Sequence, residues 1–196
     1  MMQHAANSET SLIFCMNTLL PSVFLACLLI SGGARADEKL WSLLQGGGHV
    51  VLIRHAVTTP GAGDPAGFRL DDCATQRNLT DAGRRHAQRI GAEWRARKIP
   101  VERVLSSPWC RCIETAQLAF GKAEVSQPLG NLFGRYENRE AQVRALRELA
   151  AAEGKGNIVM VTHGSTIAAL TGINPGTGEM VILAKGAPAG RLSVPE

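Results

Sequence analysis

The sequence predicts an α/β protein, a three-layer α/β/α sandwich around a mostly parallel β-sheet. Short apolar runs of strand type alternate with longer segments of helical periodicity, which is the pattern of repeated βα units. The strand runs are apolar throughout, as expected for strands buried on both faces of a parallel sheet. The 196 residues, 45% of them hydrophobic and 19% charged, are typical of one globular domain with an adequate core.

The N-terminal residues predict a signal peptide. Residues 19–30 (LLPSVFLACLLI) form an apolar block that is shorter than the roughly 20 residues of a membrane-spanning helix, and Ala34-Arg35-Ala36 follows it. The segment before the block carries no Lys or Arg, which departs from the usual export signal. We expect cleavage after Ala36 and an exported, periplasmic or extracellular domain of residues 37–196, with no stable membrane span after cleavage. An uncleaved membrane anchor is the alternative.

The first strand of the domain follows a short helical lead-in. Residues 38–44 favour a helix, and the apolar run 49–53 predicts a buried strand. Residues 57–79 carry several Gly, Pro and Asp residues without periodicity, so we expect a long loop, and such loops are usually functional or mobile. A helix is predicted over 81–98, with Thr80 as its N-cap.

A second βα unit is predicted next. Residues 101–105 form an apolar-ended strand, and Ser106-Ser107-Pro108 follows it. We expect Ser107 to cap a helix that has Pro108 in its first turn and reaches residue 120.

The remaining chain predicts two more helices and two more strands. Residues 139–153 are helical by propensity and apolar spacing, and residues 158–161 are wholly apolar and predict a strand. A short helix to residue 170 and a closing strand at 180–184 complete the domain.

Cationic and imidazole side chains stand at three of the predicted strand ends. Arg54 and His55 follow the first strand, Arg111 follows the second, and His163 follows the strand at 158–161. Ligands of open α/β sheets bind beyond the carboxyl ends of the strands. Two guanidinium and two imidazole groups at one point would repel one another without an anion, and forked guanidinium groups match phosphate oxygens. The pattern therefore predicts a site for a phosphoryl group.

A histidine in such a pocket can act as a nucleophile toward phosphorus. One ring nitrogen attacks when the other is held as a donor to a backbone carbonyl or a similar acceptor. Arginines around the equatorial oxygens stabilise the transition state, and water then hydrolyses the phosphohistidine.

The motifs around these residues resemble those of the histidine phosphatase superfamily, often called phosphoglycerate mutase-like. The family follows a strand with Arg-His-Gly, and Ala56 replaces that glycine in this sequence. Its Ser-Ser-Pro-x-x-Arg-x-x-x-Thr-Ala and Thr-His-Gly motifs are matched in the same order. The matching segments are 52–56 (LIRHA), 79–83 (LTDAG), 106–116 (SSPWCRCIETA) and 161–164 (VTHG).

The resemblance implies a phosphoglycerate mutase-like fold and a phosphomonoester hydrolase. His55 would be the nucleophile, and Arg54, Arg111 and His163 would form the phosphate pocket. The implied chemistry needs no cofactor and no metal, and the histidines lack metal-ligand spacing.

The family often supplies a glutamate that protonates the leaving oxygen, before the second histidine. The matching stretch of this sequence, residues 128–133, has no acid. Candidates for this role are Glu137 and Glu140, before the long helix, and Glu179, beside the closing strand.

The long loop holds candidates for substrate binding and for a disulfide. Arg77 and Asn78 follow the nucleophile along the chain and are candidates for substrate contacts. Cys73 can pair with Cys110 or with Cys112 in an oxidising compartment, leaving one thiol. The sequence lacks the Cys-x5-Arg loop of cysteine phosphatases, so we do not expect a cysteine nucleophile.

The net charge of +4 suits a small, anionic, phosphorylated substrate, and the basic residues are too dispersed to favour nucleic acid. Two other functions stay open. The chain can be a phosphohistidine protein phosphatase, or a pseudoenzyme that binds phosphate or a phosphorylated ligand without turnover. The sequence leaves the substrate and the oligomeric state open.

Overall fold

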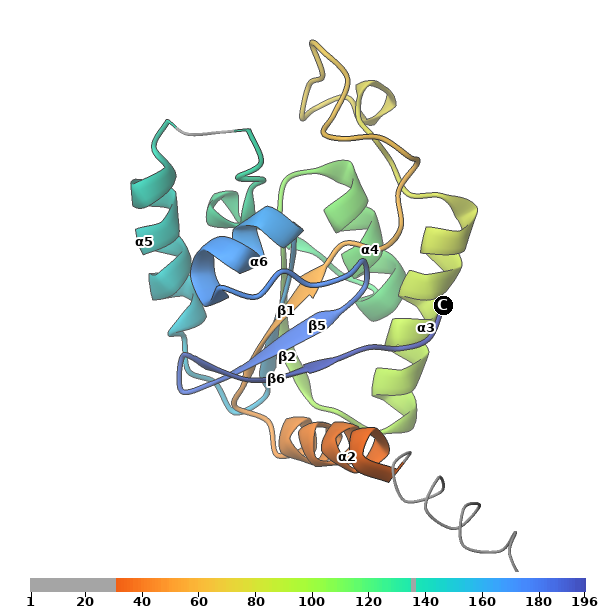
Figure 1. Ribbon diagram of the computed structural model, residues 1–196, viewed down its shortest axis with the longest axis vertical. Coiled ribbons are helices and arrows are strands. Elements are labelled where there is room, and N and C mark those ends of the chain that lie inside the picture. The colour runs from red at the N-terminus through yellow and green to blue at the C-terminus, as the bar shows by residue number, and fades with distance from the viewer. Residues whose placement is uncertain (1–30, 135–136) are drawn as a thin grey trace, which may run out of the picture. The chain divides into compact units, whose positions relative to one another are not determined.

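The computed structural model describes residues 31–134 and 137–196 (Figure 1). Residues 37–196 form one compact unit, and residues 1–36 fall into another. The apolar block predicted as part of a signal peptide, residues 19–30, lies outside the described residues. Within the described ranges, no helix is both long enough and apolar enough to cross a membrane.

The centre of the fold is a β-sheet of six strands within the described residues, in the order β3-β2-β4-β1-β5-β6. The first four strands of this order are parallel to one another; β5 is antiparallel to β1, and β6 is antiparallel to β5. This topology confirms the predicted mostly parallel sheet. The strands are β1 (Val50–Arg54), β2 (Val101–Ser106), β3 (Glu124–Val125), β4 (Asn157–Thr162), β5 (Met180–Ala184) and β6 (Ala187–Leu192).

Helices cover both faces of the sheet, which confirms the three layers (Figure 1). Helices α2, α3 and α4 pack on one face, and α5 and α6 pack on the other. The α-helices are α2 (Ser31–Gln45), α3 (Asp81–Ala96), α4 (Cys110–Phe120), α5 (Arg139–Ala150) and α6 (Gly164–Thr171), and the 3₁₀-helices are η1 (Cys73–Thr75) and η2 (Gln127–Leu129).

Strand β1 shows why the predicted strands are apolar at every position. Val51 and Ile53 enter the core beneath α3 and α4, while Val50 and Leu52 enter the core beneath α5 and α6. Because successive side chains of a strand point to opposite faces, a strand between two helical layers needs apolar residues throughout.

Several predicted helix ends are confirmed, and one predicted N-cap is wrong. The Thr80 hydroxyl accepts the Gly83 N–H at 3.0 Å, as predicted for an N-cap. Ser107 does not cap α4: that helix begins at Cys110 with Trp109 as its N-cap, so Pro108 precedes the helix. The Ser107 hydroxyl instead lies 2.8 Å from Nε2 of His163.

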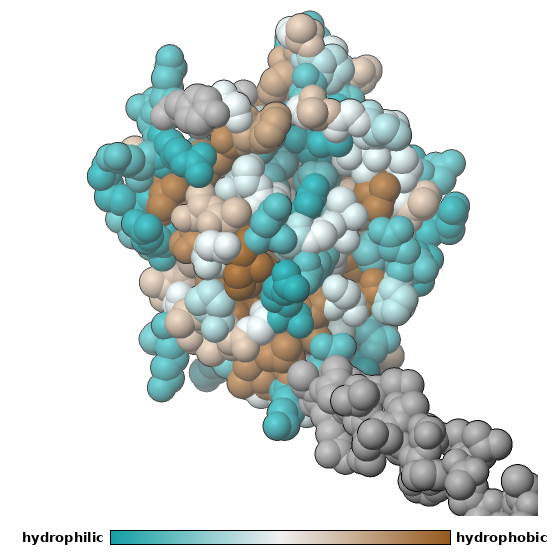
Figure 2. All heavy atoms as spheres, viewed as in Figure 1, coloured by the Kyte–Doolittle hydropathy of each residue, from teal (hydrophilic) through white to brown (hydrophobic). Residues whose placement is uncertain are grey.

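Strands β3 and β6 were not predicted. Strand β3 is only two residues long, and β6 is an edge strand whose residues are mostly exposed. Pro188 and Gly190 disfavour a strand by propensity, but both are tolerated at a sheet edge. On the face of the molecule seen in Figure 2, hydrophobic residues are interspersed with hydrophilic ones.

Candidate active site

The sheet brings the two motif histidines together. Strands β1 and β4 are parallel neighbours, with Arg54 in register with Thr162, so the next residue of each chain segment lies at the same edge. The His55 N–H donates to the Thr162 carbonyl at 2.9 Å. The ring centroids of His55 and His163 are 5.4 Å apart, in an edge-to-face arrangement.

The His55 ring has a defined tautomer. Its Nδ1 lies 2.9 Å from the carbonyl oxygen of Ala56. Since a carbonyl only accepts, Nδ1 carries the proton and Nε2 keeps its lone pair. Burial is the main cause that lowers the pKa of His55 to about 3, with a further contribution from the charges of Arg111 and Arg54 and an opposing one from the Ala56 hydrogen bond. His55 is therefore a neutral imidazole at neutral pH, with Nε2 available as a nucleophile.

Arg54, the last residue of β1, is held by the turn that precedes β5. Its Nη1 donates to the Pro175 carbonyl at 2.7 Å, and its own carbonyl accepts the Gly178 N–H at 3.0 Å. Gly178 has a φ of 70°, which favours glycine. At Gly164, a Cβ would lie 3.2 Å from Oδ1 of Asn174 and 3.4 Å from the Arg54 side chain, so Arg54 packs in van der Waals range of the start of α6.

Arg111, in the first turn of α4, is the most deeply buried of the pocket cations. Its side chain is 1% exposed and forms a two-pronged ion pair with Asp64, with Nη1–Oδ1 and Nη2–Oδ2 distances of 2.6 and 3.2 Å. Burial raises the pKa of Asp64, but the hydrogen bonds from Arg111 and the Arg77 backbone outweigh it and hold that pKa below its usual value. Asp64 is therefore ionised at neutral pH.

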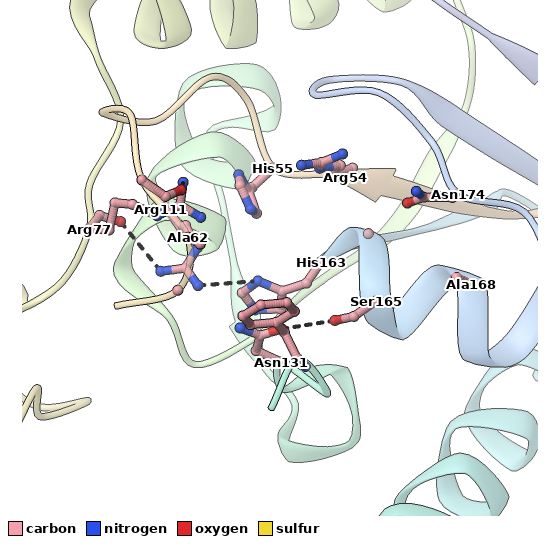
Figure 3. A pocket seen from close by; sticks show the side chains of 14 residues that line it. Arg54, His55, Ala62, Arg77, Arg111, Asn131, His163, Ser165, Ala168 and Asn174 are labelled. Carbon is pink, nitrogen blue, oxygen red and sulfur yellow. Dashed lines mark hydrogen bonds between the residues drawn. The ribbon is translucent and has the colours of Figure 1, made fainter. Parts of the chain in front are cut away.

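His163 lies between Arg111 and Ser107. Its Nδ1 is 3.5 Å from Nη2 of Arg111, which only donates, so Nδ1 is the acceptor and Nε2–H faces the Ser107 hydroxyl. Burial first, and then the charges of His55 and Arg111, hold the pKa of His163 well below its usual value. Figure 3 shows the two hydrogen bonds that link the Arg77 carbonyl to Arg111 and Arg111 to His163.

These side chains line a cavity of about 500 Å³, a size typical of small-ligand sites. Each of three arginines that line it, Arg54, Arg77 and Arg111, has a buried Nε with no acceptor within the described part of the chain. Three guanidinium groups beside one cavity favour an oxyanion as its ligand, because forked guanidinium groups match the geometry of oxyanions and carry the opposite charge. The other residues that line the cavity are Gly61, Ala62, Gly63, Asn131, Phe133, Gly164, Ser165, Ala168 and Asn174.

The structure thus brings five predicted residues to one cavity and places four others elsewhere. His55, Arg54, Arg111, His163 and Arg77 line it. Asn78 does not line the cavity. Its side-chain Nδ2 donates to the Cys73 carbonyl, within the same long loop.

The carboxylates predicted as proton donors also lie outside the lining. Glu179 accepts the Gly176 N–H at 2.7 Å and pairs with Arg191 at 3.2 Å, so its side chain closes the turn before β5 and does not reach the cavity. Glu137 and Glu140 are exposed to solvent. Among the described residues that line the cavity, none is Asp or Glu.

The disulfide joins Cys73 to Cys110, and Cys112 is a free thiol. This bond ties the long loop to α4 one residue before Arg111, and the Cys110 N–H also donates to the Gln76 side chain at 3.0 Å. Burial raises the pKa of the Cys112 thiol to about 12, so it is not a thiolate nucleophile at neutral pH.

Some functional residues carried no signal in the sequence. Asp64 is one of several acids in a loop without periodicity, and nothing in its neighbours marks it as the partner of Arg111. Asn131 and Ser165, which hydrogen-bond to each other at 2.9 Å, and Asn174 are single polar residues on three separate segments. Within the described ranges, no three His, Cys, Asp or Glu side chains gather into a group that could hold a metal ion.

Residues 50–130 match the family model of the histidine phosphatase superfamily, branch 1. A comparison with curated proteins finds no match.

Solved structures share the fold. The candidate phosphohistidine phosphatase SixA of Agrobacterium tumefaciens superposes with a TM-score of 0.51 at 24% identity, over 76% of this chain and 99% of that one. A phosphoserine phosphatase of Entamoeba histolytica, solved with 3-phosphoglyceric acid, gives 0.54 at 16%, over 74% and 97%. The protein TTHB049 of Thermus thermophilus gives 0.50 at 20%, over 74% and 99%. At these identities the likeness shows the fold.

The lowered histidine pKa values predict acid sensitivity of the ligand-free protein. An unfolded histidine has a pKa of about 6.5, so between pH 6.5 and pH 3 the unfolded chain binds a proton at residue 55 that the folded protein does not. The free energy of unfolding should therefore fall with acidification, by up to about 1.4 kcal/mol per pH unit for this residue. Urea unfolding at pH 7 and pH 5 in phosphate-free buffer measures it. His55→Asn should decline less steeply, and an equal decline in both proteins would refute the assignment.

Proposed function

We propose that this chain, a member of the histidine phosphatase superfamily through its residues 50–130, hydrolyses phosphomonoesters through a phosphohistidine intermediate at His55. One observation carries the proposal. The neutral His55 ring, with its Nδ1 proton held by the Ala56 carbonyl, lines one cavity together with the guanidinium groups of Arg54, Arg77 and Arg111. A phosphoryl group is the ligand that both features require: the arginines need an oxyanion, and the nucleophile needs an electrophilic atom at its centre.

The first step transfers the phosphoryl group to the enzyme. The Nε2 lone pair of His55 attacks phosphorus, and the bond from phosphorus to the leaving oxygen breaks with its electron pair on that oxygen. The leaving group takes a proton from solvent. The ring becomes positively charged, and its Nδ1–H donates to the Ala56 carbonyl, which stabilises that charge. Arg54, Arg77 and Arg111 stabilise the equatorial oxygens during transfer.

The second step releases phosphate. A water molecule attacks phosphorus on the side opposite His55, loses a proton, and displaces Nε2, which regains its lone pair. The sum of the two steps is ester plus water giving alcohol plus phosphate. His163 acts through Arg111: its Nδ1 accepts from Nη2 of that guanidinium, and its Nε2–H faces the Ser107 hydroxyl.

A second candidate substrate is phosphohistidine in a protein. No described residue of the lining carries a carboxylic acid, which favours a leaving group that departs without protonation by the enzyme. The imidazole ring that leaves a phosphohistidine is such a group, and so is the aryl oxide that leaves an aryl phosphate. The other candidate function, binding of a phosphorylated ligand without turnover, uses the same arginines and differs only in lacking the attack by His55.

We also propose that residues 1–36 are a signal peptide and that residues 37–196 are exported. The apolar block at 19–30 and the Ala34-Arg35-Ala36 sequence support this proposal. The disulfide between Cys73 and Cys110 supports an oxidising compartment.

The purified protein should release phosphate from 4-nitrophenyl phosphate and from a phosphohistidine peptide. His55→Ala should lower both activities at least about 10³-fold, because the other imidazole of the described lining, His163, directs its Nδ1 lone pair to Arg111. The variant should still bind orthovanadate through its arginines. Wild-type protein that binds orthovanadate and shows no turnover would favour the binding function instead.

Expression of the full chain in a Gram-negative host should give a protein whose first residue is Asp37, recovered from the periplasm. Intact-mass measurement of the purified chain reads the cleavage site directly. Blocking cleavage with Ala36→Pro should leave the longer chain associated with the membrane. A cytoplasmic product that keeps residues 1–36 would contradict the export proposal.

A further inference from the structure

The carboxylate of Asp64 accepts four hydrogen bonds beside the cavity, two on each oxygen. Its Oδ1 accepts from Nη1 of Arg111 at 2.6 Å and from the Arg77 backbone N–H at 3.1 Å. Its Oδ2 accepts from Nη2 of Arg111 at 3.2 Å and from Nε1 of Trp109 at 3.0 Å. The side chain of Asp64 is 3% exposed and that of Arg111 is 1% exposed, so water screens this ion pair very little.

Asp64 fixes the orientation of the Arg111 guanidinium. The carboxylate binds Nη1 and Nη2, the two terminal nitrogens of the guanidinium. The second hydrogen of Nη1 faces the Arg77 carbonyl at 3.3 Å, and the second hydrogen of Nη2 faces His163 Nδ1 at 3.5 Å. The donor of Arg111 without an acceptor in the described chain is Nε. The guanidinium is therefore locked in one pose before any ligand arrives.

Asp64 also sets the charge of the cavity. Arg54, Arg77 and Arg111 carry three positive charges, and His55 and His163 are neutral because burial lowers the pKa of each. The single carboxylate of Asp64 leaves two positive charges, and a phosphomonoester dianion carries two negative charges. The cavity and one fully ionised phosphoryl group are thus matched in charge.

We propose that Asp64 is a positioning residue that holds Arg111 for transition-state stabilisation and limits the charge of the pocket to that of one phosphoryl dianion. This inference rests on the proposed phosphatase function. Asp64 acts through Arg111 and not on the substrate, since it does not line the cavity.

Removing this carboxylate should separate catalysis from binding. In Asp64→Asn the Arg111 charge stays buried without a counter-ion, so a bound oxyanion becomes its only compensation and should bind more tightly. The same guanidinium loses its ionic, two-pronged anchor and keeps only the longer contacts to the Arg77 carbonyl and His163 Nδ1, so it is less well oriented when the phosphoryl group transfers, and turnover should slow. A residue that served only to hold the loop in place would instead weaken binding and turnover together.

The test compares Asp64→Asn with wild type and with Asp71→Asn, a matched control that removes the same charge from an 86% exposed side chain of the same loop. We measure kcat with 4-nitrophenyl phosphate and the Kd of orthophosphate by calorimetry. Asp64→Asn should lower kcat at least tenfold and lower the Kd threefold or more, while Asp71→Asn changes neither by more than twofold.

Parallel loss of kcat and orthophosphate affinity in Asp64→Asn would overturn the inference, and so would an unchanged or increased kcat. If that variant does not fold without ligand, Asp64→Ser refolded with orthophosphate takes its place, with the same two measurements. Absence of turnover in wild type would reject the proposed phosphatase function, and the orthophosphate affinities would still separate a charge-setting Asp64 from a purely structural one.

Discussion

Burial of three guanidinium groups around one neutral imidazole is the constraint on which the rest of the site depends. Low solvent access lowers the pKa of His55 to about 3, which keeps its Nε2 lone pair free at neutral pH. The three positive charges of Arg54, Arg77 and Arg111, which line the same cavity, repel one another unless an anion lies between them. A site so arranged is least stable when empty, and this is why an oxyanion should bind there strongly.

The sheet and its loops supply this arrangement from distant parts of the chain. Strands β1 and β4 carry the two histidines to one edge because they are parallel neighbours in register. The turn before β5 holds Arg54, and the first turn of α4 presents Arg111. The loop between β1 and α3 adds Arg77 and Asp64, and its disulfide fastens it to α4 beside Arg111.

The fold and part of the site could be predicted from the sequence because their signals are local. Apolar runs mark the buried strands, Thr80 marks a helix start, and the motif residues His55, Arg111 and His163 stand at strand ends. Asp64, Asn131 and Asn174 gave no such signal, since their importance comes from the loop path that carries them to Arg111 or the cavity. Ser107 had the pattern of a cap, but in the folded protein its hydroxyl is used by His163. Glu179 had the right residue type, yet the turn before β5 uses its carboxylate.

The most direct test of the central claim is to trap the phosphorylated enzyme. Wild-type protein mixed with an excess of a fast aryl phosphate and quenched in alkali should carry one phosphoryl group per chain. Peptide mass spectrometry should place that group on His55, and it should be lost in acid, as expected for a phosphorus–nitrogen bond. Turnover with the phosphoryl group on another residue, or hydrolysis through direct attack of water without any phosphorylated enzyme, would contradict the account.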